Sequence, residues 1–109
     1  MMKYGYAWEK LYTAVKTLAA SEERIQDRLA AAWLHSGVRL SNPVAQYLPD
    51  DLQPEFEAIH AALTKVSDPD RGAIAATCAA MSDDEASDLA ERIVTLYDAV
   101  CTVHYGSDK

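Results

Sequence analysis

The sequence predicts an all-α protein, a compact bundle of four main helices with one or two short helices. Apolar residues recur every three or four positions over most of the chain, which is the spacing that gives a helix one apolar face. Only four glycines and four prolines interrupt the 109 residues, and this composition favours helix over strand. We expect a single helical domain spanning residues 1–109, with a loose C-terminal tail at 105–109.

The first two helices are expected at 4–19 and from Ser21 onward. Ser21 is a good N-cap, and Glu22 and Glu23 would complement the positive end of the second helix. Gly37 lies where a left-handed residue would end that helix. The expected inner faces are Trp8, Leu11, Tyr12, Val15 and Leu18 in the first helix and Ile25, Leu29, Ala32 and Trp33 in the second.

The middle of the chain is mainly a connector, because the helical period is lost between residues 38 and 49. Asn42-Pro43 indicates one short helical turn, with proline at the first helical position. A third main helix is expected from residue 50 or 51, because Asp50 with Gln53 resembles a capping box and Pro54 is still tolerated in a first turn. Its buried stripe would be Leu52, Phe56, Ile59, Leu63 and Val66.

The last third of the chain carries the clearest helix signal. Residues 67–70 indicate a turn, followed by a short helix at 73–80. Ser82 and Glu85 then match the S-x-x-E capping box, which starts an amphipathic helix. We expect a core of Trp8, Leu11, Val15, Leu29, Trp33, Phe56, Ile59, Leu63, Ile93, Leu96 and Val100.

The formal charge of -7 argues against nucleic acid and against an anionic membrane surface as partners. Residues 1–49 carry six basic and four acidic side chains, whereas 50–109 carry four basic and thirteen acidic ones, so the two parts should attract each other. The longest run without Asp, Glu, Lys or Arg has eleven residues (72–82), against about 20 needed to span a bilayer.

The start of the chain has no apolar segment of the kind that a signal peptide needs, so we expect a cytoplasmic protein. Cys78 and Cys101 are then interpreted as small buried apolar residues rather than as a disulfide.

No motif for catalysis, a cofactor or a metal is found: there is no glycine-rich phosphate loop, no G-x-S-x-G turn and no H-E-x-x-H helix. We therefore expect no catalytic residue, cofactor or metal, and a protein that is not an enzyme. Asp98, Cys101 and His104 share one side of the last helix, but a structural zinc site needs four ligands. The acidic cluster that begins this helix lacks the spacing and glycine of an EF-hand.

His60 raises the alternative of a histidine phosphotransfer domain, a family that this chain resembles in size and helical architecture. The motif of that family has a large aliphatic residue, a lysine and a glycine at the second, third and fourth positions after the histidine. Ala62, Leu63 and Thr64 stand there instead. The resemblance is thus confined to fold class.

Arg24, Arg28 and Arg39 are the candidate residues for binding an anion. Arg24 and Arg28 lie one turn apart on the second helix, and Arg39 follows it. Arginines in such a pattern more often meet carboxylates of a neighbouring helix, and the acidic C-terminal part offers thirteen. Both interpretations stay open.

The segments 8–12, 81–86 and 92–98 together resemble a recurrent pattern of small uncharacterised all-helical bacterial proteins. This resemblance implies a compact helical protein and brings no activity, cofactor or site residue with it.

The first functional hypothesis is a non-enzymatic interaction or regulatory module that contacts another protein or a second copy of itself. The candidate contact residues are aromatic, because Tyr and Trp are enriched at interfaces: Tyr4, Tyr6, Trp8, Tyr47 and Tyr105. A second hypothesis is an acidic inhibitor that imitates nucleic acid, which requires carboxylates along one continuous surface. A relay domain that uses His60 is the third, and an unrecognised enzyme the fourth.

Overall fold

The computed structural model describes residues 4–41 and 44–106, and these residues form helices connected by turns, without a strand. The all-α class is thereby confirmed. The four long helices are α1 (Gly5–Ala20), α2 (Ile25–His35), α4 (Gln53–Leu63) and α6 (Asp83–Gly106). The short elements are the 3-10 helix η1 (Gly37–Leu40), α3 (Val44–Tyr47) and α5 (Ala73–Ala79). Asn42-Pro43, expected to start a short turn, lies outside the described residues.

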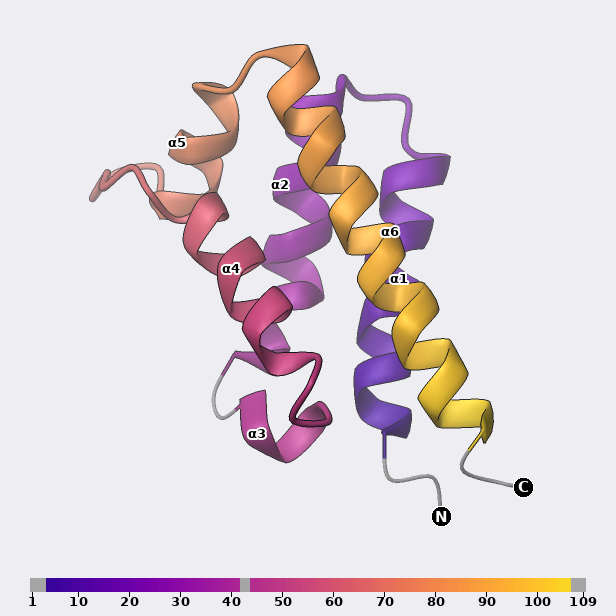
Figure 1. Ribbon diagram of the computed structural model, residues 1–109. Helices are drawn as coiled ribbons and strands as arrows, with labels where there is room; N and C mark the ends of the chain where they lie inside the picture. Colours follow the sequence, from indigo (N-terminus) through magenta and orange to yellow (C-terminus); the bar gives the residue numbers. More distant parts are fainter. Residues whose placement is uncertain (1–3, 42–43, 107–109) are drawn as a thin grey trace.

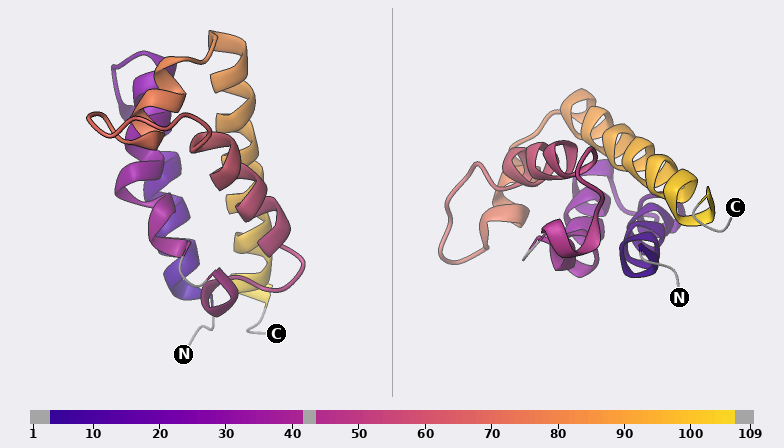
Figure 2. Two further views of the ribbon diagram at one scale, coloured as in Figure 1. Left: turned by 90° about the vertical axis from the view of Figure 1, so that its left-hand side faces the viewer. Right: turned by 60° about the horizontal axis from the view of Figure 1, so that its bottom comes forward.

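The helices form a bundle in which α1 and α6 run side by side in opposite directions (Figure 1). α1 packs against both α2 and α6, and α2 also contacts α5. The beginning of α1 and the end of α6 lie at the same end of the molecule (Figure 2). Within the described residues, no helix is long and apolar enough to cross a membrane.

One core joins all the long helices, and it differs from the expected core in α1. Trp8 and Val15 are only partly buried, whereas Ala7 and Ala14 are fully buried. The expectation for Trp8 and Val15 was wrong because the buried stripe of α1 consists of Ala7, Leu11, Ala14 and Leu18, and both α2 and α6 pack against this helix. The remaining expected core residues are buried: Leu11, Leu29, Trp33, Phe56, Ile59, Leu63, Ile93, Leu96 and Val100.

The capping box at the start of α6 is formed in both directions. The amide of Glu85 donates to Ser82 Oγ (3.1 Å), and the amide of Ser82 donates to the Glu85 carboxylate (3.0 Å). Both hydrogen bonds satisfy amides that the first helical turn leaves without a partner. Although Glu85 is exposed, its hydrogen bonds with Ser82 hold the pKa of its carboxyl group below the usual value.

The start of α2 was misplaced by four residues. Ser21 has an extended backbone and ends α1, and its Oγ accepts the amide of Glu23 (3.2 Å), which shapes the connection instead of capping a helix. α2 begins at Ile25, with Asp27 as the acidic residue of its first turn. The chain needs residues 21–24 to reverse direction before the two helices can pack against each other.

The ends of two other helices also differ from expectation. Gln53 is the first residue of α4, and its side-chain amide donates to Asp50 (3.3 Å) and to the Leu48 carbonyl (2.9 Å), so no reciprocal capping box forms there. Because α4 ends at Leu63, Val66 lies beyond the helix and is 38% exposed. α6 continues through Tyr105 to Gly106, so the expected tail begins with helical residues.

Candidate functional site

Aromatic side chains gather along the seam between α1 and α6. Trp8 and Tyr12, one turn apart on α1, have nearly parallel rings with centroids 5.5 Å apart. Tyr97 of α6 lies 6.3 Å from Tyr12, and Tyr105 meets the Trp8 ring edge-on at 6.2 Å. Early residues of α1 meet late residues of α6 because the two helices are antiparallel. We call these four residues the aromatic surface; Tyr12 is 44% and Tyr105 is 55% exposed.

His104 lies buried beneath the aromatic surface. Its ring stacks on Trp8 with centroids 5.4 Å apart and meets the edge of Tyr105 at 4.8 Å, and the residue is only 8% exposed. Asp98 is exposed and Cys101 is half-buried, so the three residues that share one side of α6 lie at different depths. Over the described residues, no group of three or more His, Cys, Asp or Glu side chains could hold a metal ion.

The Tyr97 hydroxyl belongs to this surface, and its neighbours change its pKa. A hydrogen bond with Cys101, followed by burial and by the nearby Tyr105 and Tyr12, raises the pKa of Tyr97 to about 12. At neutral pH the side chain is therefore an uncharged phenol that offers an apolar ring and one hydroxyl to a partner.

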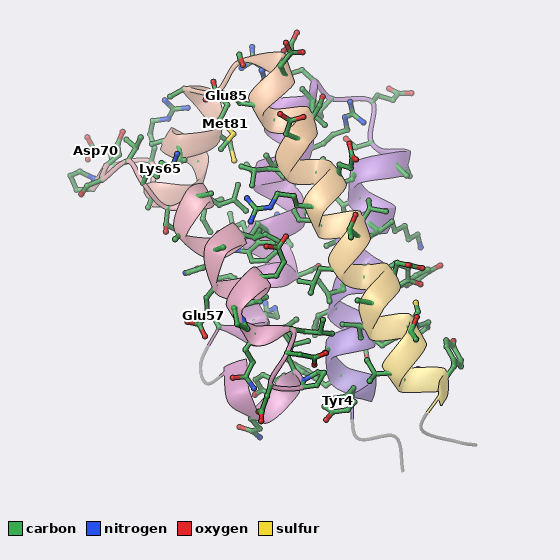
Figure 3. All side chains as sticks on the ribbon, viewed as in Figure 1. Tyr4, Glu57, Lys65, Asp70, Met81 and Glu85 are labelled. Carbon is green, nitrogen blue, oxygen red and sulfur yellow. The ribbon has the colours of Figure 1, made fainter. Side chains whose placement is uncertain are left out.

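The other expected contact residues lie beside this surface rather than in it. Tyr6 and Tyr47 pack together with ring centroids 4.9 Å apart, and Lys10 Nζ lies 5.2 Å from the centre of the Tyr6 ring. Tyr4 is partly buried at the start of α1, where Figure 3 labels it. The residue pattern of the sequence placed Tyr12 on a buried helix face and did not single out Tyr97. Their spacing from Trp8 and Cys101, one helical turn in each case, is the signal that could have placed them at the seam.

The three arginines considered for anion binding have separate partners. Arg28 Nη1 donates to the Leu18 carbonyl (2.7 Å) at the end of α1, and Arg39 Nε donates to the His35 carbonyl (3.2 Å). Arg24 pairs with Asp27 at 3.7 Å. Arg24 precedes α2 and Arg39 follows it in η1, and the eleven residues of α2 between them span about 16 Å at 1.5 Å per residue. The structure does not bring the three side chains together.

Several carboxylates of the acidic part of the chain, residues 50–109, form hydrogen bonds or ion pairs within the protein. Arg92 donates to both oxygens of Glu55 (3.1 and 2.8 Å), and this ion pair lowers the pKa of Glu55. Asp83 accepts a hydrogen bond from the Gln26 side chain (2.8 Å), and Glu85 belongs to the cap of α6. These carboxylates hold helices in place, which weighs against a continuous acidic surface that imitates nucleic acid.

His60 is held by a tryptophan from the core. The indole N–H of the fully buried Trp33 donates to His60 Nδ1 at 3.0 Å. An indole nitrogen can only donate, so Nδ1 must accept, and the neutral imidazole carries its proton on Nε2. Neither ring nitrogen then offers a lone pair outward, although a phosphoryl acceptor or a metal ligand needs one. This geometry weighs against the relay hypothesis.

Gly37 allows Trp33 to reach His60. We expected Gly37 to end α2 with a left-handed backbone, but its φ is not positive. Among the described residues, the glycine with a positive φ is Gly72 (φ 87°). Instead, a Cβ atom at Gly37 would lie 2.3 Å from Cε3 of Trp33. Gly37 is therefore required for a close approach, and its missing side chain is the space that the indole ring occupies.

His60 borders a hollow of about 500 Å³ between α4 and the end of η1. Its lining consists of Ser41, Phe56, Glu57, His60, Ala61 and Thr64. A smaller hollow of about 160 Å³ lies between α4, α5 and α6, beside Lys65, Met81 and Glu85, which Figure 3 labels. Neither hollow could be predicted from residue patterns, because each one is formed by segments far apart in the chain.

Comparison with protein-family models, with curated proteins and with solved structures found no match for this chain. The resemblance to small bacterial helical proteins therefore stays an expectation from residue patterns.

Proposed function

We propose that this protein is a non-enzymatic interaction module that pairs with a second copy of itself through the aromatic surface of α1 and α6. The observation that carries this proposal is the gathering of Trp8, Tyr12, Tyr97 and Tyr105 at one helix seam, with Tyr12 and Tyr105 about half exposed. Large aromatic side chains contribute most of the binding energy in many interfaces. Val94 on α6 adds an exposed apolar side chain (43%).

The charges that flank the aromatic surface favour a second copy as the partner. The exposed Lys16 lies one turn after Tyr12 on α1, and the exposed Asp98 follows Tyr97 on α6. A two-fold axis that runs parallel to the seam places α1 of each copy opposite α6 of the other, and the interface then uses the same patch twice. Lys16 of one copy then approaches Asp98 of the second, and opposite charges at both flanks set the register.

Sedimentation velocity over a range of concentrations tests this proposal. The expected result is a mass that rises from 12.0 kDa to twice that value. The double variant Tyr12→Ser/Tyr105→Ser should remain monomeric. Leu34→Ser removes an equally exposed apolar side chain (51%) from α2 and should pair as the natural chain does. A natural chain that stays monomeric throughout would refute self-association.

A charge exchange tests the register separately. Lys16→Glu and Asp98→Lys should each weaken pairing, because each variant places like charges opposite one another. The combined variant Lys16→Glu/Asp98→Lys restores opposite charges and should regain pairing. If the combined variant pairs no better than either single one, the two-fold arrangement is wrong.

A further inference from the structure

We propose that the hollow beside His60 binds a small molecule that carries a primary ammonium group next to a carbonyl or carboxylate oxygen, as an amino acid or an aminoacyl amide does. The proposal concerns α4 and Ser41, which lie apart from the aromatic surface of α1 and α6, and it is independent of self-association. Three features of the lining support it: one fixed donor, a set of acceptors, and their spacing.

The fixed donor is the Nε2–H of His60. Trp33 occupies Nδ1 from the buried side, and the two ring nitrogens point in divergent directions, so Nε2–H points away from the core. Among the described residues, nothing accepts a hydrogen bond from Nε2. The Trp33 contact fixes both the ring orientation and the position of the proton, and such a preorganised donor selects an oxygen acceptor on the ligand.

The remaining polar groups of the hollow are acceptors. Ser41 Oγ donates its proton to the Val38 carbonyl (2.6 Å), and Thr64 Oγ1 donates to the His60 carbonyl (2.8 Å), so both hydroxyls present lone pairs. The exposed Glu57 carboxylate adds a negative charge on the side of α4 away from α6 (Figure 3). A carboxylate with two hydroxyl acceptors matches an ammonium group, which has three donors and no acceptor.

The spacing fits one ligand that uses both kinds of group. Glu57 and His60 are three residues apart on α4, so their Cβ atoms are about 5–6 Å apart. Both side chains therefore leave the same side of α4. The nitrogen and carbonyl oxygen of an amino acid are about 3 Å apart, so with a hydrogen bond of about 3 Å at each end one ligand can span up to about 9 Å between Nε2 of His60 and the Glu57 carboxylate. The volume of about 500 Å³ lies within the usual range of small-molecule sites.

Titration of ¹⁵N-labelled protein by NMR tests this site, with the Trp33 indole N–H signal as the internal reporter of His60. L-Alaninamide and L-alanine are the two probes, and they distinguish a carbonyl from a carboxylate as the preferred acceptor. Either one should move the indole signal in a saturable way at up to about 10 mM, which saturates a site with a dissociation constant of about 1 mM. Methylamine and acetate each carry half of the recognised chemistry and should bind more weakly.

Two exposed carboxylates provide matched variants. Glu57→Gln should weaken binding of the better probe by at least about tenfold, because it removes the charge-assisted contact to the ammonium group. Glu91→Gln makes the same change on α6, away from the hollow, and should leave binding unchanged. The proposal is overturned if neither probe moves the indole signal, if methylamine binds as tightly as L-alaninamide, or if both variants bind equally well.

Discussion

Gly37→Ala should destabilise this protein by displacing Trp33, and the size of the effect follows from the structure. The added Cβ would lie 2.3, 2.6 and 2.7 Å from three indole carbons, far inside contact distance. Overpacking of a core typically costs about 1–3 kcal/mol, and loss of the Trp33–His60 hydrogen bond adds about 1 kcal/mol. The better helix propensity of alanine offsets up to about 1 kcal/mol. We therefore expect a net loss of about 1–4 kcal/mol.

Urea unfolding followed by circular dichroism measures this loss, and the Trp33 indole signal in an NMR spectrum shows whether the ring has moved. Gly72→Ala is the matched control, because Gly72 has a φ of 87° and no atom within 4 Å of an added Cβ. Its cost should be about 1–3 kcal/mol from backbone strain alone, because φ 87° with ψ 152° is a conformation that only glycine adopts readily, and the indole signal should not change.

A double-mutant cycle separates the steric cause from others. In a Trp33→Phe background the ring is smaller, so Gly37→Ala should cost clearly less than in the natural chain. Additive effects of the two substitutions, or a Gly37→Ala variant with natural stability and an unmoved indole signal, would refute the close-approach explanation.

Three further predictions concern stability and reactivity. Ser82→Ala should lower the free energy of unfolding by about 1 kcal/mol through loss of the cap, measured by urea unfolding; an unchanged midpoint would contradict the capping role. Because Arg92 lowers the pKa of Glu55, the ion pair stabilises the fold above the unfolded pKa near 4.5 and is lost as pH falls through the folded value. Glu55→Gln should therefore flatten the stability profile on the acid side, and an unchanged profile would contradict this. Burial raises the pKa of Cys78 to about 11, so at pH 8 about one Cys78 thiol in a thousand is ionised; iodoacetamide with mass spectrometry should label Cys101 first, and Cys78 only after unfolding.

Local signals in the sequence predicted those parts of the fold that local interactions decide. The start of α6 was predicted correctly because Ser82 and Glu85 are three residues apart and satisfy each other's amides without help from the rest of the chain. The start of α2 was not, because Ser21 is equally suited to begin a helix or to shape the turn before one. The packing of α1 against α2 decides between these two uses, and a single sequence does not contain that information.

The predicted core residues of α1 were partly wrong for a related reason. Helical spacing alone places Trp8, Leu11 and Val15 on one side, and hydrophobicity then favours the larger residues as core. The structure buries the stripe Ala7, Leu11, Ala14 and Leu18 and leaves Trp8 and Val15 only partly buried, because α2 and α6 both pack against α1. Trp8 is thereby moved to the seam, where it meets α6 and contributes to the aromatic surface.

The chemistry of His60 depends on a residue 27 positions earlier in the chain. In the sequence, His60 indicated one alternative, a phosphoryl acceptor, and the residues that follow it did not match the motif of that family. The structure shows a different role, because the indole N–H of Trp33 donates to Nδ1 and leaves the proton on Nε2. Gly37 in turn decides whether that indole fits. A substitution that adds one carbon at Gly37 should therefore change the hydrogen bonding of His60 without touching it, and the hollow on α4 should lose its oriented donor.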